Sequence, residues 1–136
     1  MKFIDTHTHL YLEHFSEDID TVISNSISSG IDRLFLPNIS SETTKDMLDL
    51  CKKYPKTCYA MMGLHPCDVK SESMEKELLH VEELLNKEKF IAVGEIGIDL
   101  YWDKSTLPLQ KESFIFQINL AKKHKLPIVI HTRDSF

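Results

Sequence analysis

The stretch Ile4-Asp5-Thr6-His7-Thr8-His9-Leu10 begins inside a short apolar run at the start of the chain. Side chains on an extended strand alternate between its two faces, so His7 and His9 point the same way. Neutral imidazole is a common ligand of divalent metal ions, and two imidazoles on one face can grip such an ion together. A lone His-x-His pair also occurs in ordinary surface turns, so the rest of the chain has to distinguish these two interpretations.

Short apolar runs alternate with longer amphipathic segments along the whole sequence. The apolar runs predict five strands, at Lys2–Asp5, Asp32–Leu36, Cys58–Gly63, Phe90–Val93 and Pro127–Ile130. The segments between them predict four helices, at Ser16–Ser29, Ser40–Tyr54, Glu75–Asn86 and Leu109–His124. This repetition predicts a single α/β domain over residues 1–136, with parallel strands joined by right-handed crossovers.

Composition excludes several classes of protein. The formal net charge of −5 argues against a broad basic surface for nucleic acid, although bound divalent cations can supply positive charge at a local phosphate site. The three cysteines, Cys51, Cys58 and Cys67, show no C-x-x-C spacing, which favours reduced thiols in a cytoplasmic protein. No apolar run has membrane length and the N-terminus lacks the pattern of a signal peptide, so we expect no membrane association.

Polar side chains of metal-binding type follow each predicted strand. In chain order they are His7 and His9, then Asn38, His65, Glu95 and His131. The loops at the carboxyl ends of parallel barrel strands carry the active site, so this pattern favours a metal site over a surface turn. No G-x-G-x-x-G follows any strand, which leaves a dinucleotide-binding sheet without direct support.

Four motifs in order resemble the TatD family of metal-dependent deoxyribonucleases. They are Asp5–Leu10, Gly63-Leu64-His65-Pro66, Gly94-Glu95-Ile96-Gly97-Ile98-Asp99 and Pro127–Asp134. The resemblance implies a TIM-type (β/α)8 barrel of the metal-dependent hydrolase kind, of which this chain holds about five strands. It also implies two-metal hydrolysis of DNA phosphodiester bonds, with single strands or DNA ends as the substrate and no obligate protein partner.

The resemblance further implies a set of metal ligands. His7 and His9 hold one ion, Glu95 bridges it to a second, and His131 holds the second. A carboxylate has two oxygens and can bridge ions about 3.5–4 Å apart. Histidine and carboxylate ligands suit zinc, manganese and, with more waters, magnesium, so the sequence does not distinguish these metals.

The same resemblance assigns catalytic roles. Glu95 belongs to the catalytic group, and His65 and Arg133 hold a phosphate. Asp99 orients a ligand or a water. Two interpretations of Arg133 stay open, because it could instead pair with Asp99 or Asp134.

The segment after Glu95 brings two aromatic residues to the same rim. Tyr101 and Trp102 could stack on a nucleobase, or they could form an apolar plug over the barrel.

A (β/α)8 barrel usually needs about 250 residues, so we expect residues 1–136 to be the N-terminal portion of a longer protein. The family pattern calls for a further histidine and an aspartate from later strands, and the remaining half of the barrel would complete the site. Two half-barrels pairing in a homo-oligomer is an alternative. Other functions stay open too: a related barrel hydrolase acting on ester or amide bonds such as those of aminoacyl-tRNA, or a non-catalytic half-barrel.

Overall fold

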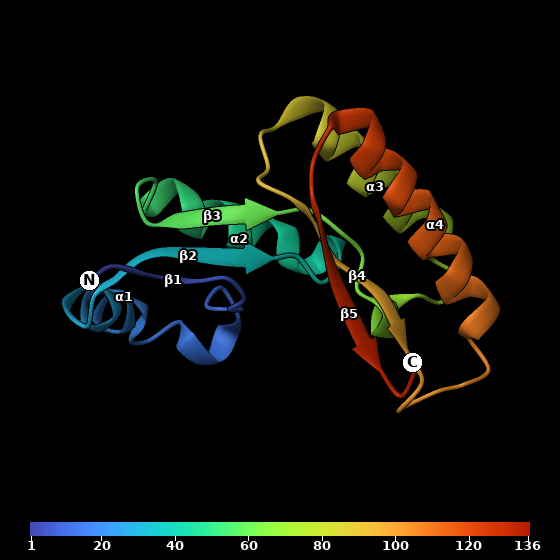
Figure 1. The fold of residues 1–136 in the computed structure, drawn as a ribbon, viewed down its shortest axis with the longest axis horizontal. Helices are drawn as coiled ribbons and strands as arrows, with labels where there is room; N and C mark the ends of the chain where they lie inside the picture. Colours follow the sequence, from blue (N-terminus) through green and yellow to red (C-terminus); the bar gives the residue numbers. More distant parts are fainter.

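The computed structural model describes all residues, Met1–Phe136, as five strands that alternate with four helices (Figure 1). The strands are β1 (Phe3–Asp5), β2 (Ile31–Pro37), β3 (Cys58–Met61), β4 (Val93–Asp99) and β5 (Ile128–Arg133). The helices are α1 (Ile19–Ser28), α2 (Ser41–Lys53), α3 (Met74–Lys87) and α4 (Leu107–His124), with short 3-10 turns η1 (Glu13–Phe15) and η2 (Pro66–Asp68). None of these helices combines the length and the apolar character that crossing a membrane requires.

All strand pairs are parallel, as the alternation of strand and helix predicts. β1, β2 and β3 pair in sequence order, and β4 pairs with β5. A parallel bridge between Met62 and Val93 joins the two groups. The strands form no closed barrel, so β1 and β5 are edges. The α/β class is confirmed, and the arrangement is that of a partial barrel.

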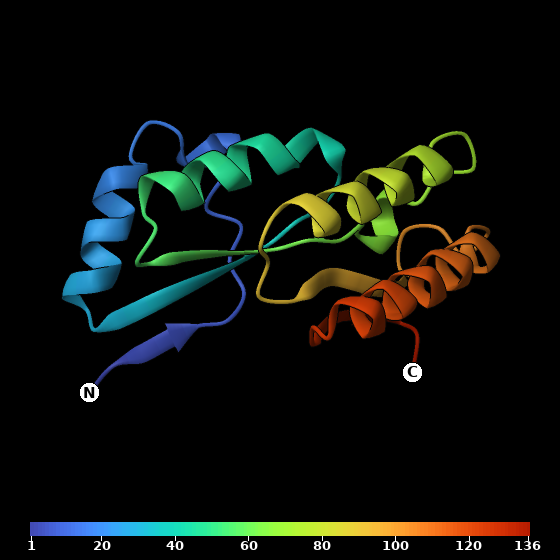
Figure 2. The same ribbon diagram turned by 90° about the horizontal axis from the view of Figure 1, so that it is seen from above.

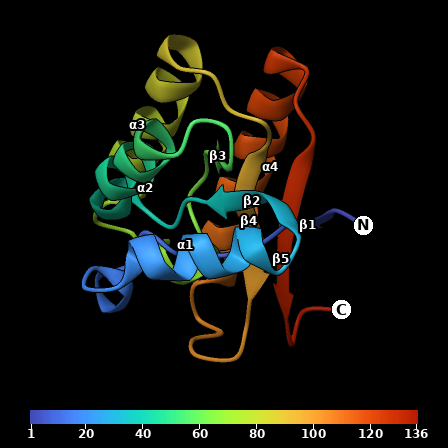
Figure 3. The same cartoon turned by 90° about the vertical axis from the view of Figure 1, so that its left-hand side faces the viewer.

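The helices cover one side of the strands. Figure 2 shows α1, α2 and α3 on the same side of β1–β3, while Figures 2 and 3 place both chain ends on the other side. Buried apolar side chains fill the space between the layers, among them Ile23, Leu36, Met47, Val81, Ile96 and Leu120. Full burial of such a side chain contributes about 1.5–3 kcal/mol. On the edge strands, by contrast, Ile4 and Ile130 stay 48% and 53% exposed.

The fourth strand differs from its prediction. It covers Val93–Asp99 rather than Phe90–Val93, so Glu95 lies within the strand and not after it. Glycines weaken a strand prediction, but here Gly97 lets two backbones approach closely. Its φ is +148°, and a Cβ at this position would lie 2.0 Å from the backbone oxygen of His131 on β5.

Two other predicted boundaries, the start of one helix and the end of one strand, were also wrong. α1 begins at Ile19 rather than Ser16, because Glu13–Phe15 forms the separate turn η1. β5 continues to Arg133, so His131 lies inside the strand rather than just beyond it.

Helix α4 buries a polar face. Gln110, Ser113 and Gln117 are buried, whereas Phe114 and Ile118, which apolar spacing predicts to face inward, are only half-buried. Both glutamines hydrogen-bond to backbone at the ends of other segments, and this explains their burial.

Candidate metal centre

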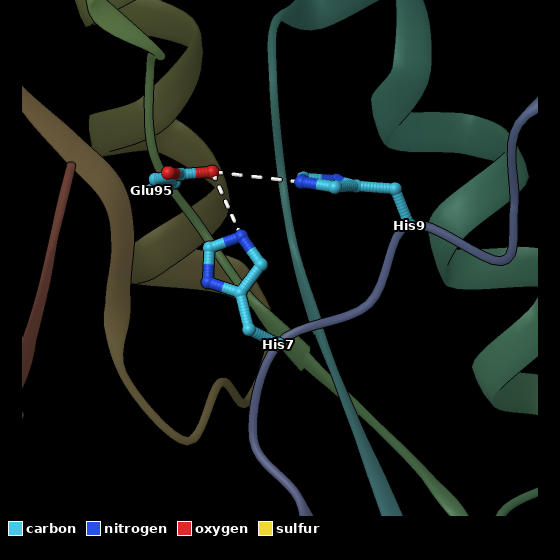
Figure 4. Close-up of side chains that lie close together, drawn as sticks. All are labelled: His7, His9 and Glu95. Atoms are coloured by element: carbon cyan, nitrogen blue, oxygen red, sulfur yellow. Dashed lines mark ion pairs between the residues drawn. The ribbon is translucent and has the colours of Figure 1, made fainter. Parts of the chain in front are cut away.

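The carboxylate of Glu95 lies at the centre of four histidines. Its Oε2 is 3.0 Å from His7 Nε2 and 3.5 Å from His9 Nε2 (Figure 4). Its Oε1 is 2.8 Å from His131 Nδ1 and 3.8 Å from His65 Nε2. The two oxygens therefore face two different pairs of imidazoles, and Glu95 belongs to both groups of candidate metal ligands.

His7 and His9 come from the loop that directly follows β1. The backbone N–H of Thr8 donates to Phe35 O on β2 at 3.1 Å, which fixes this loop against the sheet. Asp5 Oδ1 accepts a hydrogen bond from the backbone N–H of His7 at 3.1 Å. Both imidazoles point at Glu95 (Figure 4), and because they lie beyond the end of β1 the loop rather than strand alternation gives them this shared direction.

Tyr11 sets the protonation of His9. The Tyr11 hydroxyl donates its proton to the carbonyl oxygen of Pro37, so its oxygen accepts from His9 Nδ1–H at 2.7 Å. Burial raises the pKa of Tyr11, which keeps this hydroxyl protonated. With the proton on Nδ1, the lone pair of His9 Nε2 faces Glu95.

Asp99 fixes the tautomer of His131 in the same way. Its Oδ2 lies 2.8 Å from His131 Nε2 and accepts that proton, which leaves the lone pair on Nδ1 facing Glu95 Oε1. A carboxylate that fixes the tautomer of a metal-ligating histidine is a common outer partner in metal sites. Burial would raise the pKa of Asp99, but hydrogen bonds from His131 and from the Tyr101 backbone lower it overall.

The arrangement of the histidines around Glu95 is suited to binding cations. Lone pairs of His9 and His131 face oxygens of a buried carboxylate, a contact that is repulsive unless a proton or cation lies between them. Two ligand atoms each about 2.1 Å from a tetrahedral zinc ion lie about 3.4 Å apart, and the observed separations of 2.8–3.8 Å lie around this value. Burial would raise the pKa of Glu95, but the four surrounding histidines lower it to about 2, so the carboxylate is charged.

His65 differs from the other three histidines. Its Nδ1 accepts from the backbone N–H of Cys67 at 3.1 Å, so the neutral ring carries its proton on Nε2. Burial lowers the pKa of His65 to about 4 against the opposing charge of Glu95, which keeps the ring neutral. Nε2 lies 3.2 Å from His131 Nδ1 and can donate to it. His65 therefore presents a hydrogen-bond donor toward the site.

Arg133 and Asn38 are the remaining residues that the sequence predicts near the site. Arg133, exposed at the end of β5, forms no ion pair with Asp99 or Asp134; its guanidinium carbon lies 3.8 Å from the ring centre of Tyr101. Asn38 is fully buried, and its side chain donates to Ser40 O and Gly63 O, so it joins backbone segments and does not reach the carboxylate cluster. The expectation of a ligand-type side chain after the second strand was wrong for this reason.

Sequence reasoning missed the side chains that support this centre. Gln110 exchanges two hydrogen bonds with the backbone of Asp99, and Gln117 does the same with Leu64, the neighbour of His65. Their spacing of seven residues on α4 places both on one helix face, the only sequence signal that could have indicated a shared role. Tyr11 had no such signal.

Comparisons with known proteins show similarity to metal-dependent hydrolases and nucleases. The family model described as TatD related DNase matches residues 4–136. The uncharacterized metal-dependent hydrolase YabD of Bacillus subtilis is 37% identical, with 96% of this chain and 51% of that protein covered. The 3'-5' ssDNA/RNA exonuclease TatD of Salmonella typhimurium is 28% identical, with 96% and 50% covered.

A solved structure shows the same fold. The crystal structure of YjjV, a TatD homolog from Escherichia coli K12, superposes with a TM-score of 0.88 at 32% identity, covering 97% of this chain and 51% of that one. The chain thus spans about half the length of the relatives that it matches.

Proposed function

The chain belongs to the TatD-related DNase family, and from this premise we propose that its site serves metal-dependent hydrolysis of phosphodiester bonds in single-stranded DNA or at DNA ends. The observation that carries the proposal is the position of Glu95, which turns one carboxylate oxygen toward each of two histidine pairs. That geometry suits a carboxylate shared by two divalent ions.

The proposed ligands divide into two groups. His7, His9 and Glu95 Oε2 would hold one ion, and Glu95 Oε1 with His131 would hold the other. Zinc, manganese and magnesium all suit this donor set, magnesium with more water ligands. Bound divalent ions would supply an acidified water and would neutralise charge that develops on the phosphate.

His65 and Arg133 would position the phosphate. The Nε2–H of His65 points into the site and the ring is neutral, so it can donate to a phosphate oxygen without adding a charge. Arg133 is free of ion pairs, and a guanidinium offers a planar fork of donors that matches phosphate. The exonuclease activity named for the Salmonella relative supports nucleic acid as the substrate class.

Cleavage by the purified complete protein tests the proposal, because the remaining half of the barrel would supply the other site residues. We expect hydrolysis of a labelled single-stranded oligonucleotide with Mn²⁺, Mg²⁺ or Zn²⁺, and none with EDTA. Glu95→Gln should lower the rate by at least about 100-fold, because it removes the shared charge. Glu83→Gln, on the exposed face of α3, is the matched control and should keep the full rate.

A substrate panel separates the alternatives. Hydrolysis of an aminoacyl-tRNA ester with no cleavage of oligonucleotides would overturn the phosphodiester assignment while keeping the metal centre. Equal activity of Glu95→Gln and the parent protein would overturn the site itself.

A further inference from the structure

Three side chains cluster at the rim beside the metal centre, outside the ligand groups. Arg133 ends β5, and Tyr101 and Trp102 lie in the segment that follows β4. The Arg133 guanidinium carbon is 3.8 Å from the Tyr101 ring centre and 5.7 Å from that of Trp102. The two aromatic rings meet edge to face, 4.7 Å apart at 88°. We refer to these three residues as the aromatic rim.

The aromatic rim is open to solvent. Trp102 is 73% exposed and Tyr101 is 52% exposed, so both rings are accessible to a ligand in this chain. The Arg133 guanidinium lies over the Tyr101 ring and forms no ion pair with a carboxylate, which leaves its N–H groups available to a ligand.

Asp99 connects the aromatic rim to the metal centre. Its Oδ2 accepts from His131 Nε2, while its Oδ1 accepts from the backbone N–H of Tyr101 at 2.9 Å. The backbone N–H of Leu100 also donates to Arg133 O at 2.9 Å. One carboxylate therefore holds both a candidate metal ligand and the start of the aromatic segment, at a fixed separation.

We propose that the aromatic rim binds one nucleotide of a single-stranded nucleic acid beside the bond that the metal centre cleaves. A nucleobase stacks on the exposed indole of Trp102, and the N–H edge of Arg133 holds the adjoining phosphate. Tyr101 keeps Arg133 in place through its ring. The location beside the scissile bond rests on the proposed function, while the binding of the base rests on these three side chains.

The chemistry favours a single strand over a duplex. The face of a base is available for stacking on a protein ring only when the base is unstacked from its neighbours, and such stacking tolerates any base. Duplex binding relies on many phosphate contacts from a broad basic surface, and the net charge of −5 argues against such a surface.

Tryptophan fluorescence of the 136-residue chain measures this contact directly, because Trp102 is the only tryptophan within these residues. A short oligothymidylate is titrated into the purified chain in EDTA, so that binding is measured without cleavage. We expect saturable quenching of the Trp102 emission. An abasic oligonucleotide of equal length carries the same phosphates without bases, and we expect it to leave the emission unchanged.

Variants separate the base contact from the phosphate contact. By anisotropy of a labelled oligothymidylate, Trp102→Ala should weaken binding at least about fivefold, the effect of one lost base stack, and Trp102→Phe should restore most of it. Arg133→Gln should weaken binding and reduce its dependence on salt. The matched control is a second arginine–tyrosine pair, Arg33 over Tyr59 near the starts of β2 and β3, where Arg33→Gln should change nothing.

The outcomes distinguish this inference from the proposed function. No quenching, or equal quenching by the abasic oligonucleotide, would overturn the nucleotide site even if metal-dependent cleavage is found. Quenching by oligothymidylate that Trp102→Ala abolishes would support the site even if no cleavage occurs.

Discussion

At the scale of single residues, the candidate centre depends on side chains that decide which imidazole nitrogen carries the proton. Tyr11 directs the lone pair of His9 toward Glu95, and Asp99 does the same for His131. The histidines and Glu95 could be predicted as candidate metal ligands from the sequence, because imidazole and carboxylate side chains commonly bind metal ions. Tyr11 could not, because its role comes from a contact with Pro37 across 26 residues of chain.

Removing the Tyr11 hydroxyl tests this support. Tyr11→Phe leaves the ring in place but frees His9 to adopt either tautomer, so we expect metal affinity to fall about 10- to 100-fold. Competition with a fluorescent chelator measures that affinity. Tyr59→Phe, whose hydroxyl contacts only the exposed backbone of Lys56, is the control. Unchanged affinity in Tyr11→Phe would show that the hydrogen bond does not orient His9.

Gly97 offers a second test at this scale. A Cβ at Gly97 would meet the His131 backbone oxygen at 2.0 Å, so Gly97→Ala must displace β5. We expect a loss of about 3 kcal/mol or more in the free energy of unfolding. Gly30 also has a positive φ, +96°, but its Cβ would meet its nearest neighbour at 3.3 Å, so Gly30→Ala should cost only about 1–2 kcal/mol. Urea denaturation compares the two, and equal losses would contradict the close approach of β4 and β5.

At the scale of elements, apolar periodicity predicted four of the five strands and all four helices, while the strand predicted at Phe90–Val93 overlaps β4 only at Val93. The prediction failed where polar residues are buried and where a glycine allows two strands to pack closely. β4 extends through Gly94 and Gly97 because β5 approaches them closely, and propensity alone cannot anticipate that neighbour. α4 buries Gln110 and Gln117 because their side chains hydrogen-bond to the backbone of Asp99 and Leu64, as a neighbouring strand would do. Apolar patterns do not indicate such contacts.

The Gln117 contact has a measurable consequence. Gln117→Met keeps the volume of the side chain but leaves the buried N–H and C=O of Leu64 without partners, so we expect a loss of about 2–4 kcal/mol in unfolding free energy. Thermal and urea denaturation measure it, with exposed Asn119→Met on the same helix as the control. A loss below about 0.5 kcal/mol would mean that Leu64 finds other partners.

At the scale of the whole molecule, ionisation of the centre links its stability to pH. The pKa of His65 falls from its ordinary value of 6.5 to about 4 in the folded chain, chiefly through burial. Between these values the unfolded chain binds more protons, so stability falls as pH is lowered from 6.5 to 4. The pKa of Glu95 is about 2, below its ordinary 4.5, so its contribution is present above pH 4.5 and is lost as pH falls toward 2.

Melting temperatures of the metal-free chain across this range test the linkage. His65→Gln should flatten the decline between pH 6.5 and 4 and leave the decline below pH 4.5 in place. His14→Gln removes an exposed histidine outside the centre and should reproduce the parent profile. A parent-like slope in His65→Gln would show that His65 does not lie buried and neutral in the folded chain.

The central claim is that Glu95 joins two metal positions, and electron paramagnetic resonance of the chain titrated with Mn²⁺ tests it most directly. We expect two Mn²⁺ ions per chain with the spectrum of a spin-coupled pair, because one carboxylate would bridge them. Glu95→Gln should abolish the coupling. A single bound ion, or two ions with uncoupled spectra, would contradict the shared centre.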